Sequence, residues 1–373
     1  EKSGEEHAMT FVPELKKMIP EIHFWGVGGD ELASTGMDLK YHLKDFSSWG
    51  VSEVISKIPF YFKALANIEQ EVKDMECKVA ILIDFQEFNM RLAKKLKKSG
   101  VNVLYYVAPQ AWVWKEWRAN VLGDYVHTLF TILKFEKDWF MKRGVPNVVS
   151  ISHPLWNHYH KIINENKEEL GLVKKPFSNF KKEINIIILP GSRNSEVKVL
   201  LSSFMNAAKK LKERHPVKLG IVKSQNVNSD YYGPYDQDFD QVWNSEDLSA
   251  GLLWADLSIA TSGTVTLACA LFEVPTIVNF NSSLLNEWIF YSFIKYKGFA
   301  SLANIVHQQK VFPELLGQAS SEYNIEQEIL NWIENEQAYI QTKKYISNTL
   351  VLIDESGTNV SETMKELIKE SYE

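Results

Sequence analysis

The alternation of short apolar runs with longer amphipathic segments constrains the fold of this sequence more than any other feature. Five apolar runs occupy the first part of the chain, at residues 22–27, 79–83, 101–107, 128–133 and 147–151. Each is followed by a polar turn and a segment of helical periodicity, as residues 79–83 are followed by 88–98. Strands and helices that alternate in this way predict a parallel β-sheet with helices on both faces.

A second domain of the same kind is expected from residue 184. Residues 184–189 (INIIIL) are almost continuously apolar, which is typical of a strand buried on both faces. Further strands are expected at 217–222, 257–260 and 276–280, and helices at 196–214 and 264–272. The sequence therefore predicts an α/β fold of two doubly wound domains, with a cleft lined by the carboxyl ends of their strands.

The domain boundaries follow from a change in composition between these halves. Residues 158–183 are rich in Lys, Asn and Glu and are predicted to be a linker. They separate an N-terminal domain (1–157) from a C-terminal domain (184–344). The chain opens on a polar turn, residues 1–6, that leads directly into a helical pattern. An α/β domain normally places an apolar strand before such a turn, so we expect the first strand of the N-terminal domain to be absent from this sequence.

Length and composition exclude several classes of protein. With 373 residues, 45% hydrophobic and 24% charged, the chain has the proportions of a globular protein of two or three domains. A net charge of −6 argues against broad nucleic-acid binding. Cys77 and Cys269 are far apart, so neither a disulfide framework nor a zinc site is predicted. No uncharged apolar stretch reaches the ~18 residues needed to cross a bilayer, and a reducing cytoplasm is the expected compartment.

Two turns in the second half have the features of anion sites. Gly191, Ser192 and Arg193 follow the strand at 184–189 and open a helix, so unpaired N–H groups and a planar cation come together there. Residues 262–264 (Ser-Gly-Thr) repeat the arrangement after the strand at 257–260. Each turn alone is also explained by ordinary helix capping, but together they favour a nucleotide or sugar diphosphate. The glycine run at 26–29 lacks a third glycine in register, which argues against hydride transfer.

The first half offers acidic, aromatic and imidazole candidates. Asp84 ends a strand and begins a helix, where a carboxylate serves either as a general base or as a helix cap. Residues 105–114 (YYVAPQAWVW), which include Pro109 and Trp112, are unusually aromatic for a loop; they either line a sugar or acyl pocket or pack in the core. His153 follows the strand at 147–151 and is a further candidate, although a lone histidine is more often structural.

Two stretches combine apolar bulk with lysine, as helices that lie on membrane surfaces do. Residues 51–65 include Val54, Ile58, Phe60 and Phe62, and residues 284–299 include Trp288, Phe290 and Phe293. Core packing is the alternative interpretation of each stretch. Because one occurs in each half, we expect contact with a membrane surface.

Taken in order, the motifs of the chain resemble those of the lipid-A-disaccharide synthase family. They run from Glu-x-Ser-Gly at 1–4 and Gly-Val-Gly-Gly at 26–29 through WGVSEV (49–54), Ile-Asp…Phe-Asn (83–89) and YVAPxxWVW (106–114). They continue with FEK (135–137), HPL (153–155), LPGSR (189–193), SGT (262–264), SLxN (301–304) and PELL (313–316). Each motif is weak by itself, but the ordered set covers almost the whole chain and is specific.

The resemblance implies a fold, a reaction and a set of site residues. It implies a GT-B fold, an inverting and metal-independent glycosyltransferase without cofactor, and residues 345–373 that pack back on the N-terminal domain. The implied substrates are UDP-2,3-diacylglucosamine and 2,3-diacylglucosamine 1-phosphate (lipid X), used at the inner face of the cytoplasmic membrane. Asp84 and Arg193 match the essential residues of the family. Acceptor binding is expected at Ser3, Gly4, Glu5, Asn89, Pro109, Trp112 and His153, and nucleotide binding at Gly191, Ser192, Arg193, Ser262, Gly263, Thr264, Asn304 and Glu314.

Several positions depart from the family pattern. Glu5 stands where the family has Asp, Ala268 where it has a Glu for the ribose, and Asn281 where it has a cation. These departures leave two alternatives to the disaccharide-forming enzyme: a UDP-sugar epimerase or other sugar transferase of the same fold, and a relative that binds lipid or nucleotide without catalysis. The sequence does not predict an oligomeric state.

Overall fold

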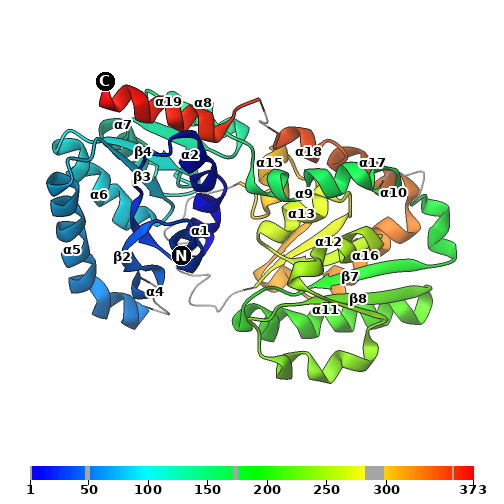
Figure 1. The fold of residues 1–373 in the computed structure, drawn as a ribbon. Coiled ribbons are helices and arrows are strands. Elements are labelled where there is room, and N and C mark those ends of the chain that lie inside the picture. The colour runs from blue at the N-terminus through cyan, green and yellow to red at the C-terminus, as the bar shows by residue number, and fades with distance from the viewer. Residues whose placement is uncertain (1, 47–50, 171–174, 282–297, 355–356) are drawn as a thin grey trace. The chain divides into compact units, whose positions relative to one another are not determined.

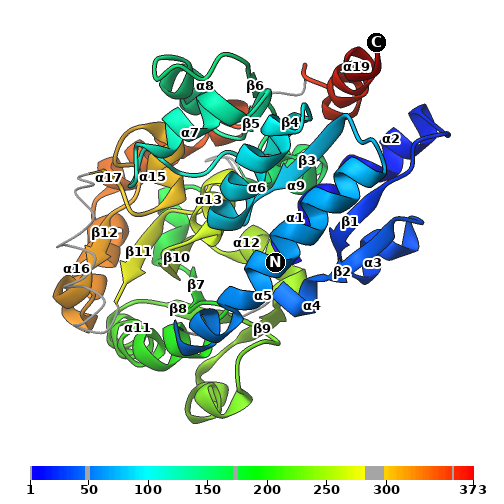
Figure 2. The ribbon, with the colours of Figure 1, turned by 90° about the vertical axis from the view of Figure 1, so that its left-hand side faces the viewer.

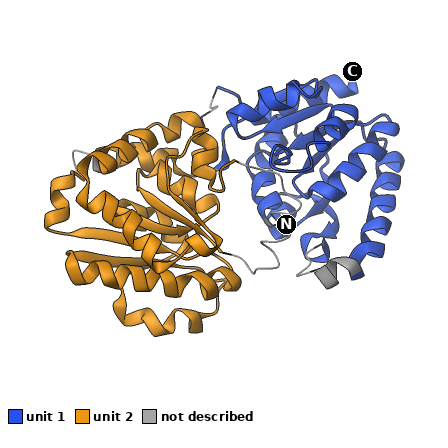
Figure 3. Cartoon of the chain, turned by 180° about the vertical axis from the view of Figure 1, so that it is seen from behind, with its two compact units in different colours: residues 1–154, 354–373 blue, residues 155–353 orange. Residues whose placement is uncertain are grey.

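The computed structural model describes residues 2–46, 51–170, 175–281, 298–354 and 357–373 (Figure 1). The chain divides into two compact units, drawn in different colours in Figure 3. Unit 1 comprises residues 1–154 and 354–373, and unit 2 comprises residues 155–353. Each unit has its own parallel sheet, and each is described by itself.

Unit 1 contains a four-stranded parallel sheet of order β3-β4-β5-β6 and a separate parallel pair, β1-β2. The strands are β1 (Trp25–Gly28), β2 (Asp38–His42), β3 (Val79–Ile83), β4 (Asn102–Tyr106), β5 (Thr128–Thr131) and β6 (Val148–Ser150). The helices are α1 (Lys2–Met9), α2 (Val12–Met18), α3 (Asp30–Ser34), α4 (Leu43–Phe46), α5 (Val51–Asp74), α6 (Gln86–Lys98), α7 (Arg118–Tyr125), α8 (Lys134–Met141) and α19 (Val360–Tyr372).

A cavity of about 660 Å³ separates the two sheets of unit 1. It is lined by Trp25 and Val27 of β1, by all five residues of β3, and by apolar side chains of the surrounding helices. Within the described chain β1 pairs only with β2 and β3 only with β4, so each strand leaves one edge unpaired (Figure 2). This explains why β3, although entirely apolar (VAILI), is mostly half-buried.

The C-terminal helix belongs to unit 1. Met364 and Ile368 of α19 are buried in the same cluster as Phe11, Val12 and Leu15 at α2. A hydrogen bond of 2.9 Å from Asn102 Nδ2 to Ser371 Oγ joins the end of α19 to β4. The chain therefore leaves unit 1 at the start of α9 and returns to it after α18.

Unit 2 contains a six-stranded parallel sheet of order β12-β11-β10-β7-β8-β9. The strands are β7 (Ile184–Leu189), β8 (Val217–Lys223), β9 (Gln241–Asn244), β10 (Leu257–Thr261), β11 (Thr276–Phe280) and β12 (Glu314–Leu316). The helices are α9 (Pro154–Glu165), α10 (Lys167–Leu170), α11 (Asn194–Arg214), α12 (Leu248–Trp254), α13 (Thr264–Leu271), α15 (Leu302–His307), α16 (Glu322–Glu334), α17 (Glu336–Ile346) and α18 (Thr349–Leu352). Short 3₁₀ turns occupy Phe177–Lys181, Ser229–Tyr231, Gly233–Asp238, Ser245–Asp247 and Gly317–Ala319.

Alternate residues of β7 belong to two hydrophobic cores on opposite faces of this sheet. Ile186 and Ile188 pack with α11 and α16 on one face, whereas Ile187 and Leu189 pack with α9, α12 and α13 on the other. Successive side chains of a strand point to opposite faces, so a strand buried on both must be apolar throughout. The continuous run INIIIL is thus explained by helices on both sides of the sheet.

The segment expected to be a linker is largely helical. Residues 154–165 form α9, and Tyr159, Ile163 and Leu170 are buried in the core of unit 2. The polar composition reflects the exposed face of an amphipathic helix, whose buried positions are too few to stand out in the sequence. Across the described residues, no helix is both long enough and apolar enough to span a membrane.

Candidate active site

Backbone strain concentrates where β3 and β4 end in unit 1. Asp84 and Phe85 follow β3 with φ of +48° and +39°, and Val107 follows β4 with φ of +67°. Ile83 lies opposite Tyr106 in the sheet, so the two strained turns are neighbours. A left-handed conformation costs of order 1–3 kcal/mol for a non-glycine residue and is least favourable for a β-branched one. Such strain clusters at functional sites, which makes this edge the candidate active site of unit 1.

Two buried side chains hold Asp84 in this conformation. Tyr105 Oη donates to the Asp84 carbonyl at 2.9 Å, and Asn89 Nδ2 donates to the carbonyls of Asp84 at 2.8 Å and Ile83 at 3.0 Å. Asn89, expected to bind the acceptor, thus shapes the turn that presents Asp84. The Asp84 side chain is half-buried and accepts none of these bonds, so its carboxylate remains available.

His7 lies near Asp84 and His153 lies near His7, and sequence reasoning identified only His153. His153 follows β6 and is buried; burial, with a smaller effect of the neighbouring His7, lowers its pKa to about 4. His7 lies on α1, where burial lowers its pKa while the charge of Asp84 acts in the opposite direction. His7 was missed because α1 and β3 are more than 70 residues apart, and nothing local to α1 indicates that they meet.

The start of α1 supplies three of the expected acceptor residues. Ser3 and Gly4 are half-buried, and a Cβ placed on Gly4 would lie 3.9 Å from Ile83 Cγ2, so α1 packs on the end of β3. Glu5 is buried, and its Oε1 accepts hydrogen bonds of 2.9 Å from the N–H groups of Gly29 and Leu32. The carboxylate therefore caps the N-terminus of α3, and we assign Glu5 a structural role.

The aromatic loop after β4 is fixed by a buried carboxylate. Pro109 is buried, and Trp112 Nε1 donates to Glu136 Oε1 at 3.0 Å. Glu136 Oε2 accepts from the N–H of Leu133 at 3.2 Å and caps α8. Burial raises the pKa of Glu136 to about 7, although these hydrogen bonds oppose the effect. Glu136 was visible only as part of the motif FEK; its link to Trp112 requires the folded chain.

In unit 2, the carboxylate of Glu196 already binds the turn at 191–193, the first of the two predicted anion sites. Gly191 has φ of +118°, and Arg193, whose side chain is 76% exposed, precedes α11 as its N-cap residue. Glu196 Oε2 accepts from the N–H of Ser192 at 3.1 Å, and Glu196 Oε1 pairs with Arg193 Nη1 at 3.0 Å. The side chain of Glu196 thus makes the contacts that a phosphate would make at this helix start.

The turn at 262–264, the second predicted anion site, lies beside the first. Leu189 pairs with Ala260 between the adjacent parallel strands β7 and β10, so the turns that follow these strands leave the same edge of the sheet. Gly263 has φ of +155°, and a Cβ placed on it would meet nothing within 4 Å. Thr264 begins α13 there, while Ser262 Oγ donates to the Ala300 carbonyl at 3.0 Å. The backbone at Gly263 is therefore open to a ligand.

Glu314 and Asn304 bind each other and the neighbouring loop. Glu314 Oε1 accepts from Ser301 N and Asn304 Nδ2, both at 2.8 Å, and Ala300 N donates to the same carboxylate. Asn304 is fully buried, and its Oδ1 accepts from Val311 N and Phe312 N, both at 2.8 Å. Because its amide is used within the protein, Asn304 holds the loop at 300–304 in place and offers no free group to a ligand.

The two positions of unit 2 that depart from the family pattern, Ala268 and Asn281, differ in their surroundings. Ala268 is 1% exposed within α13 and packs in the core, so this position supplies no polar group. Asn281 is half-buried directly after β11. In the described chain, no three His, Cys, Asp or Glu side chains gather closely enough to hold a metal ion.

The expected membrane residues fall into three groups. Ile58 and Phe62 are 43% and 60% exposed and lie four residues apart on α5. Phe60 differs, because it packs edge-to-face on Phe46 at 5.2 Å between ring centroids and contributes to the core. The side chain of Val54 and residues Trp288, Phe290 and Phe293 lie outside the described part of the structure.

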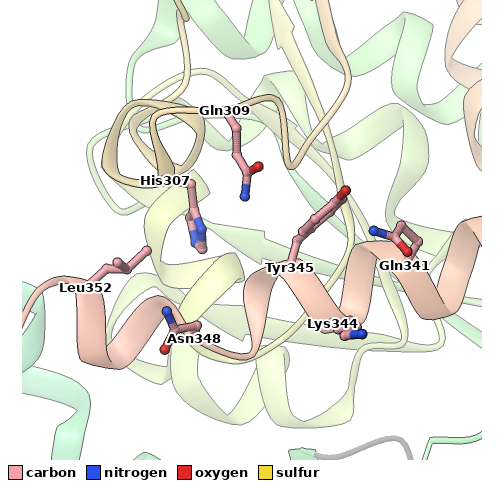
Figure 4. A pocket seen from close by; sticks show the side chains of 7 residues that line it. All are labelled: His307, Gln309, Gln341, Lys344, Tyr345, Asn348 and Leu352. Atoms are coloured by element: carbon pink, nitrogen blue, oxygen red, sulfur yellow. The ribbon is translucent and has the colours of Figure 1, made fainter.

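A second cavity, of about 410 Å³, lies in unit 2 and contains none of the expected site residues. Its lining comes from the end of α15 and from α17 and α18, as Figure 4 shows: His307, Gln309, Gln341, Lys344, Tyr345, Asn348 and Leu352. His307 Nε2 lies 2.9 Å from Thr349 Oγ1, and burial lowers the pKa of His307 to about 4.

Comparison with known proteins shows the family of the chain. Residues 1–369 match the family described as lipid-A-disaccharide synthetase. The lipid-A-disaccharide synthase of Nitrosococcus oceani is 31% identical over 340 residues, which cover 90% of this chain and 86% of that protein. The enzyme of the same name from Myxococcus xanthus is 30% identical over 347 residues and covers 89% and 86%, respectively.

Solved structures of low sequence identity share the fold. A putative UDP-N-acetylglucosamine 2-epimerase from Listeria monocytogenes superposes with a TM-score of 0.55 at 12% identity and covers 91% of this chain and 88% of its own. MurG of Acinetobacter baumannii superposes with a TM-score of 0.53 at 13% identity and covers 94% of this chain and 100% of its own.

The two Rossmann-like units and the structures they superpose on show that the chain has the GT-B fold, as expected. The chain belongs to the lipid-A-disaccharide synthetase family, whose reaction forms the lipid A disaccharide. The resemblance drawn from the ordered motifs is thereby confirmed.

Proposed function

We propose that the protein transfers diacylglucosamine from UDP-2,3-diacylglucosamine to the 6-hydroxyl of 2,3-diacylglucosamine 1-phosphate (lipid X). The products are the disaccharide 1-phosphate and UDP. The observation that carries this proposal is the available carboxylate of Asp84 on a strained turn, in a chain of this family. A free carboxylate at a strained strand end is what base-assisted attack by a hydroxyl requires.

The turns at 191–193 and 262–264 of unit 2 bind the diphosphate of the donor in this proposal. The N–H groups at Ser192 and Gly263, together with the exposed guanidinium of Arg193, suit the two phosphates of UDP. They would stabilise the charge that develops on the leaving diphosphate, which is electrostatic catalysis by fixed donors. The ribose contact of the family is not provided by Ala268, so the turns carry a larger part of nucleotide binding here.

The reaction then balances in one displacement step. Asp84 helps to remove the proton from the acceptor 6-hydroxyl, and the new bond forms between that oxygen and the anomeric carbon of the donor. The bond from the anomeric carbon to the diphosphate oxygen breaks, and its electron pair leaves with UDP. Attack opposite the leaving group inverts the anomeric centre.

Contact with a membrane surface is part of the proposal, because both substrates carry acyl chains. Ile58 and Phe62 expose apolar surface on α5, and the neighbouring Lys63 is also exposed. Apolar side chains beside lysine suit the interface of an anionic membrane, which we take to be the inner face of the cytoplasmic membrane.

Replacing both apolar residues, Ile58→Ser with Phe62→Ser, should therefore weaken binding to anionic phospholipid vesicles at least tenfold in a cosedimentation assay. Burial of one such side chain is worth about 1.5–3 kcal/mol. The matched control pair is Ile340→Ser with Val351→Ser, which removes exposed apolar side chains from α17 and α18. Equal vesicle binding by both double variants would exclude α5 as the contact surface.

Product analysis tests the reaction itself. The protein is incubated with both lipid substrates, and products are measured by mass spectrometry. We expect the disaccharide 1-phosphate and an equimolar amount of UDP. Formation of an epimerised UDP-sugar without disaccharide would identify an epimerase instead, and UDP binding without any turnover would identify a non-catalytic relative.

A further inference from the structure

Arg118, the first residue of α7, is almost completely buried although it carries a charge. Its side chain is 3% exposed, and its guanidinium makes two hydrogen bonds. Nη1 donates to Gln86 Oε1 at 2.6 Å, and Nη2 donates to Glu87 Oε1 at 2.7 Å. These acceptors belong to the first two residues of α6. Arg118 therefore fixes the start of α6 from a distant part of the sequence.

The start of α6 directly follows the strained turn that presents Asp84. Asp84 and Phe85, both left-handed, immediately precede this helix. The N-cap position holds Phe85, whose side chain cannot accept the hydrogen bond that Ser, Thr, Asp or Asn supplies there. Strained conformations persist where the surrounding structure over-determines them. The hydrogen bonds of Tyr105 and Asn89 hold the carbonyls of the turn, and those of Arg118 hold the helix that follows it.

The same guanidinium joins α6 to the aromatic loop after β4. Arg118 Cζ lies 5.3 Å from the centroid of the Trp114 ring. Lys115 Nζ lies 4.3 Å from the ring of Trp114 and donates to Glu87 Oε1 at 2.7 Å. Lys115 is itself left-handed, with φ of +58°. Because Glu87 accepts from both cations, the position of the start of α6 depends on that of the loop.

One donor of the guanidinium, the Nε–H of Arg118, is buried and has no hydrogen-bond partner within the described chain. Buried donors are nearly always paired, so an unpaired one calls for an explanation. Both terminal nitrogens of the same group bond to side chains of α6. The placement of the guanidinium thus serves the start of α6 rather than the pairing of all its own donors.

We propose that Arg118 is a positioning residue of the transfer reaction: its two hydrogen bonds to the first residues of α6 hold the turn that presents the Asp84 carboxylate. This inference rests on the proposed function. Arg118 acts through Asp84, whose carboxylate must meet the acceptor hydroxyl at hydrogen-bond distance. A displacement of about 1 Å in such a group can lower the rate by about 10²-fold.

A double-mutant cycle on kcat tests whether Arg118 acts through Asp84. Arg118→Lys keeps the positive charge but lacks the planar pair of donors, so its kcat should fall by about 10²-fold. In the double variant with Asp84→Asn, kcat should equal that of Asp84→Asn alone, because no carboxylate remains to be positioned. A loss of similar size in both backgrounds, or the wild-type kcat in Arg118→Lys, would overturn the proposal.

Arg143→Lys is the matched control for the loss of a guanidinium. Arg143 also belongs to unit 1, lies 3.8 Å from the ring centroid of Trp139 and donates from Nε to Glu116 Oε1 at 2.6 Å. These contacts are with α8 and with the residues before α7, so the variant should keep the wild-type kcat. A loss as large as that of Arg118→Lys would overturn the proposal, because the effect would not depend on α6.

Gln86→Leu decides the question if Arg118→Lys does not fold. The position is half-buried, and the substitution removes one acceptor of the guanidinium while leaving Arg118 in place. Loss of one hydrogen bond should lower kcat about threefold or more, again with no effect in the Asp84→Asn background. The wild-type kcat in Gln86→Leu would overturn the proposal.

Hydrogen exchange follows the turn without reference to activity. Peptides that cover residues 84–89 should exchange faster in Arg118→Lys than in wild type, and peptides that cover β5 should not change. Unchanged exchange at 84–89 would overturn the proposal. If the wild-type protein forms no disaccharide from the two lipid substrates, the proposed function fails; if it does and Arg118→Lys keeps its kcat, only the role of Arg118 fails.

Discussion

At the residue scale, carboxylates that are buried or half-buried in this protein fix the loops that carry the candidate site. Glu5 caps α3, Glu136 holds Trp112 and caps α8, and Glu314 binds the loop at 300–304. Glu136 and Glu314 lie within the family motifs and Glu5 directly follows one. Each accepts hydrogen bonds from groups that lie ten or more residues away or at a helix start. Their motif positions could be predicted from sequence, but their roles could not, because the partners are brought together only by folding.

Glu136 provides a prediction about stability and pH. Its pKa is raised from 4.5 to about 7 in the folded protein, so between these values the folded state keeps a proton that the unfolded state loses. Stability should therefore fall as pH rises from 4.5 to about 7, by roughly 3 kcal/mol at 1.36 kcal/mol per pKa unit.

Urea unfolding at pH 5 and pH 8 measures this effect. Glu136→Gln cannot ionise, so its loss of stability between the two pH values should be smaller than that of wild type. Glu31→Gln, at an exposed position, is the control and should behave like wild type. The same pH dependence in wild type and Glu136→Gln would contradict the assignment.

At the element scale, the hydrophobic pattern of the sequence identified the strands that are rich in apolar residues. The predictions at 79–83, 184–189 and 276–280 coincide with β3, β7 and β11, because apolar residues predominate in these strands (VAILI, INIIIL and TIVNF). The sequence analysis did not predict β2, β9 and β12. These strands are short, contain polar residues (DLKYH, QVWN and ELL) and lie at the edges of their sheets. Edge strands need less apolar surface, so hydrophobic pattern identifies them poorly.

The start of α11 offers a prediction on nucleotide affinity. The carboxylate of Glu196 occupies the N–H of Ser192 and pairs with Arg193, so UDP must displace it. Glu196→Gln removes the like charge and should strengthen UDP binding three- to tenfold, as expected for about 1 kcal/mol of helix-terminus electrostatics.

Isothermal titration with UDP at low ionic strength is the suitable measurement. Glu213→Gln, near the other end of the same helix and exposed, is the matched control and should leave affinity unchanged. Weaker binding by Glu196→Gln would show that Glu196 orients Arg193 for the nucleotide rather than competing with it.

At the scale of the whole molecule, each unit has its own core, and the last helix completes that of unit 1. Met364 is fully buried between α19 and α2, and truncation of a buried Met to Ala typically costs 2–5 kcal/mol. Met364→Ala should thus lower the unfolding midpoint of unit 1 while UDP binding by unit 2 is retained.

Calorimetry of the full chain, with UDP titration on the same samples, checks this prediction. Glu366→Ala, an exposed position of the same helix, is the control. An unchanged thermal transition in Met364→Ala would mean that α19 contributes nothing to the stability of unit 1. The return of the chain to unit 1 was expected from the family resemblance alone, because no local pattern shows which core a terminal helix joins.

Turnover of Asp84→Asn, with both lipid substrates at saturation, is the most direct measurement of the central claim. The variant keeps the size and the backbone bonds of the turn but lacks the charge, so kcat should fall at least 10²-fold while UDP affinity is unchanged. Asp124→Asn, an exposed position of α7, should keep the wild-type rate. Near-normal turnover by Asp84→Asn would contradict the account, because no other carboxylate is assigned to the acceptor hydroxyl.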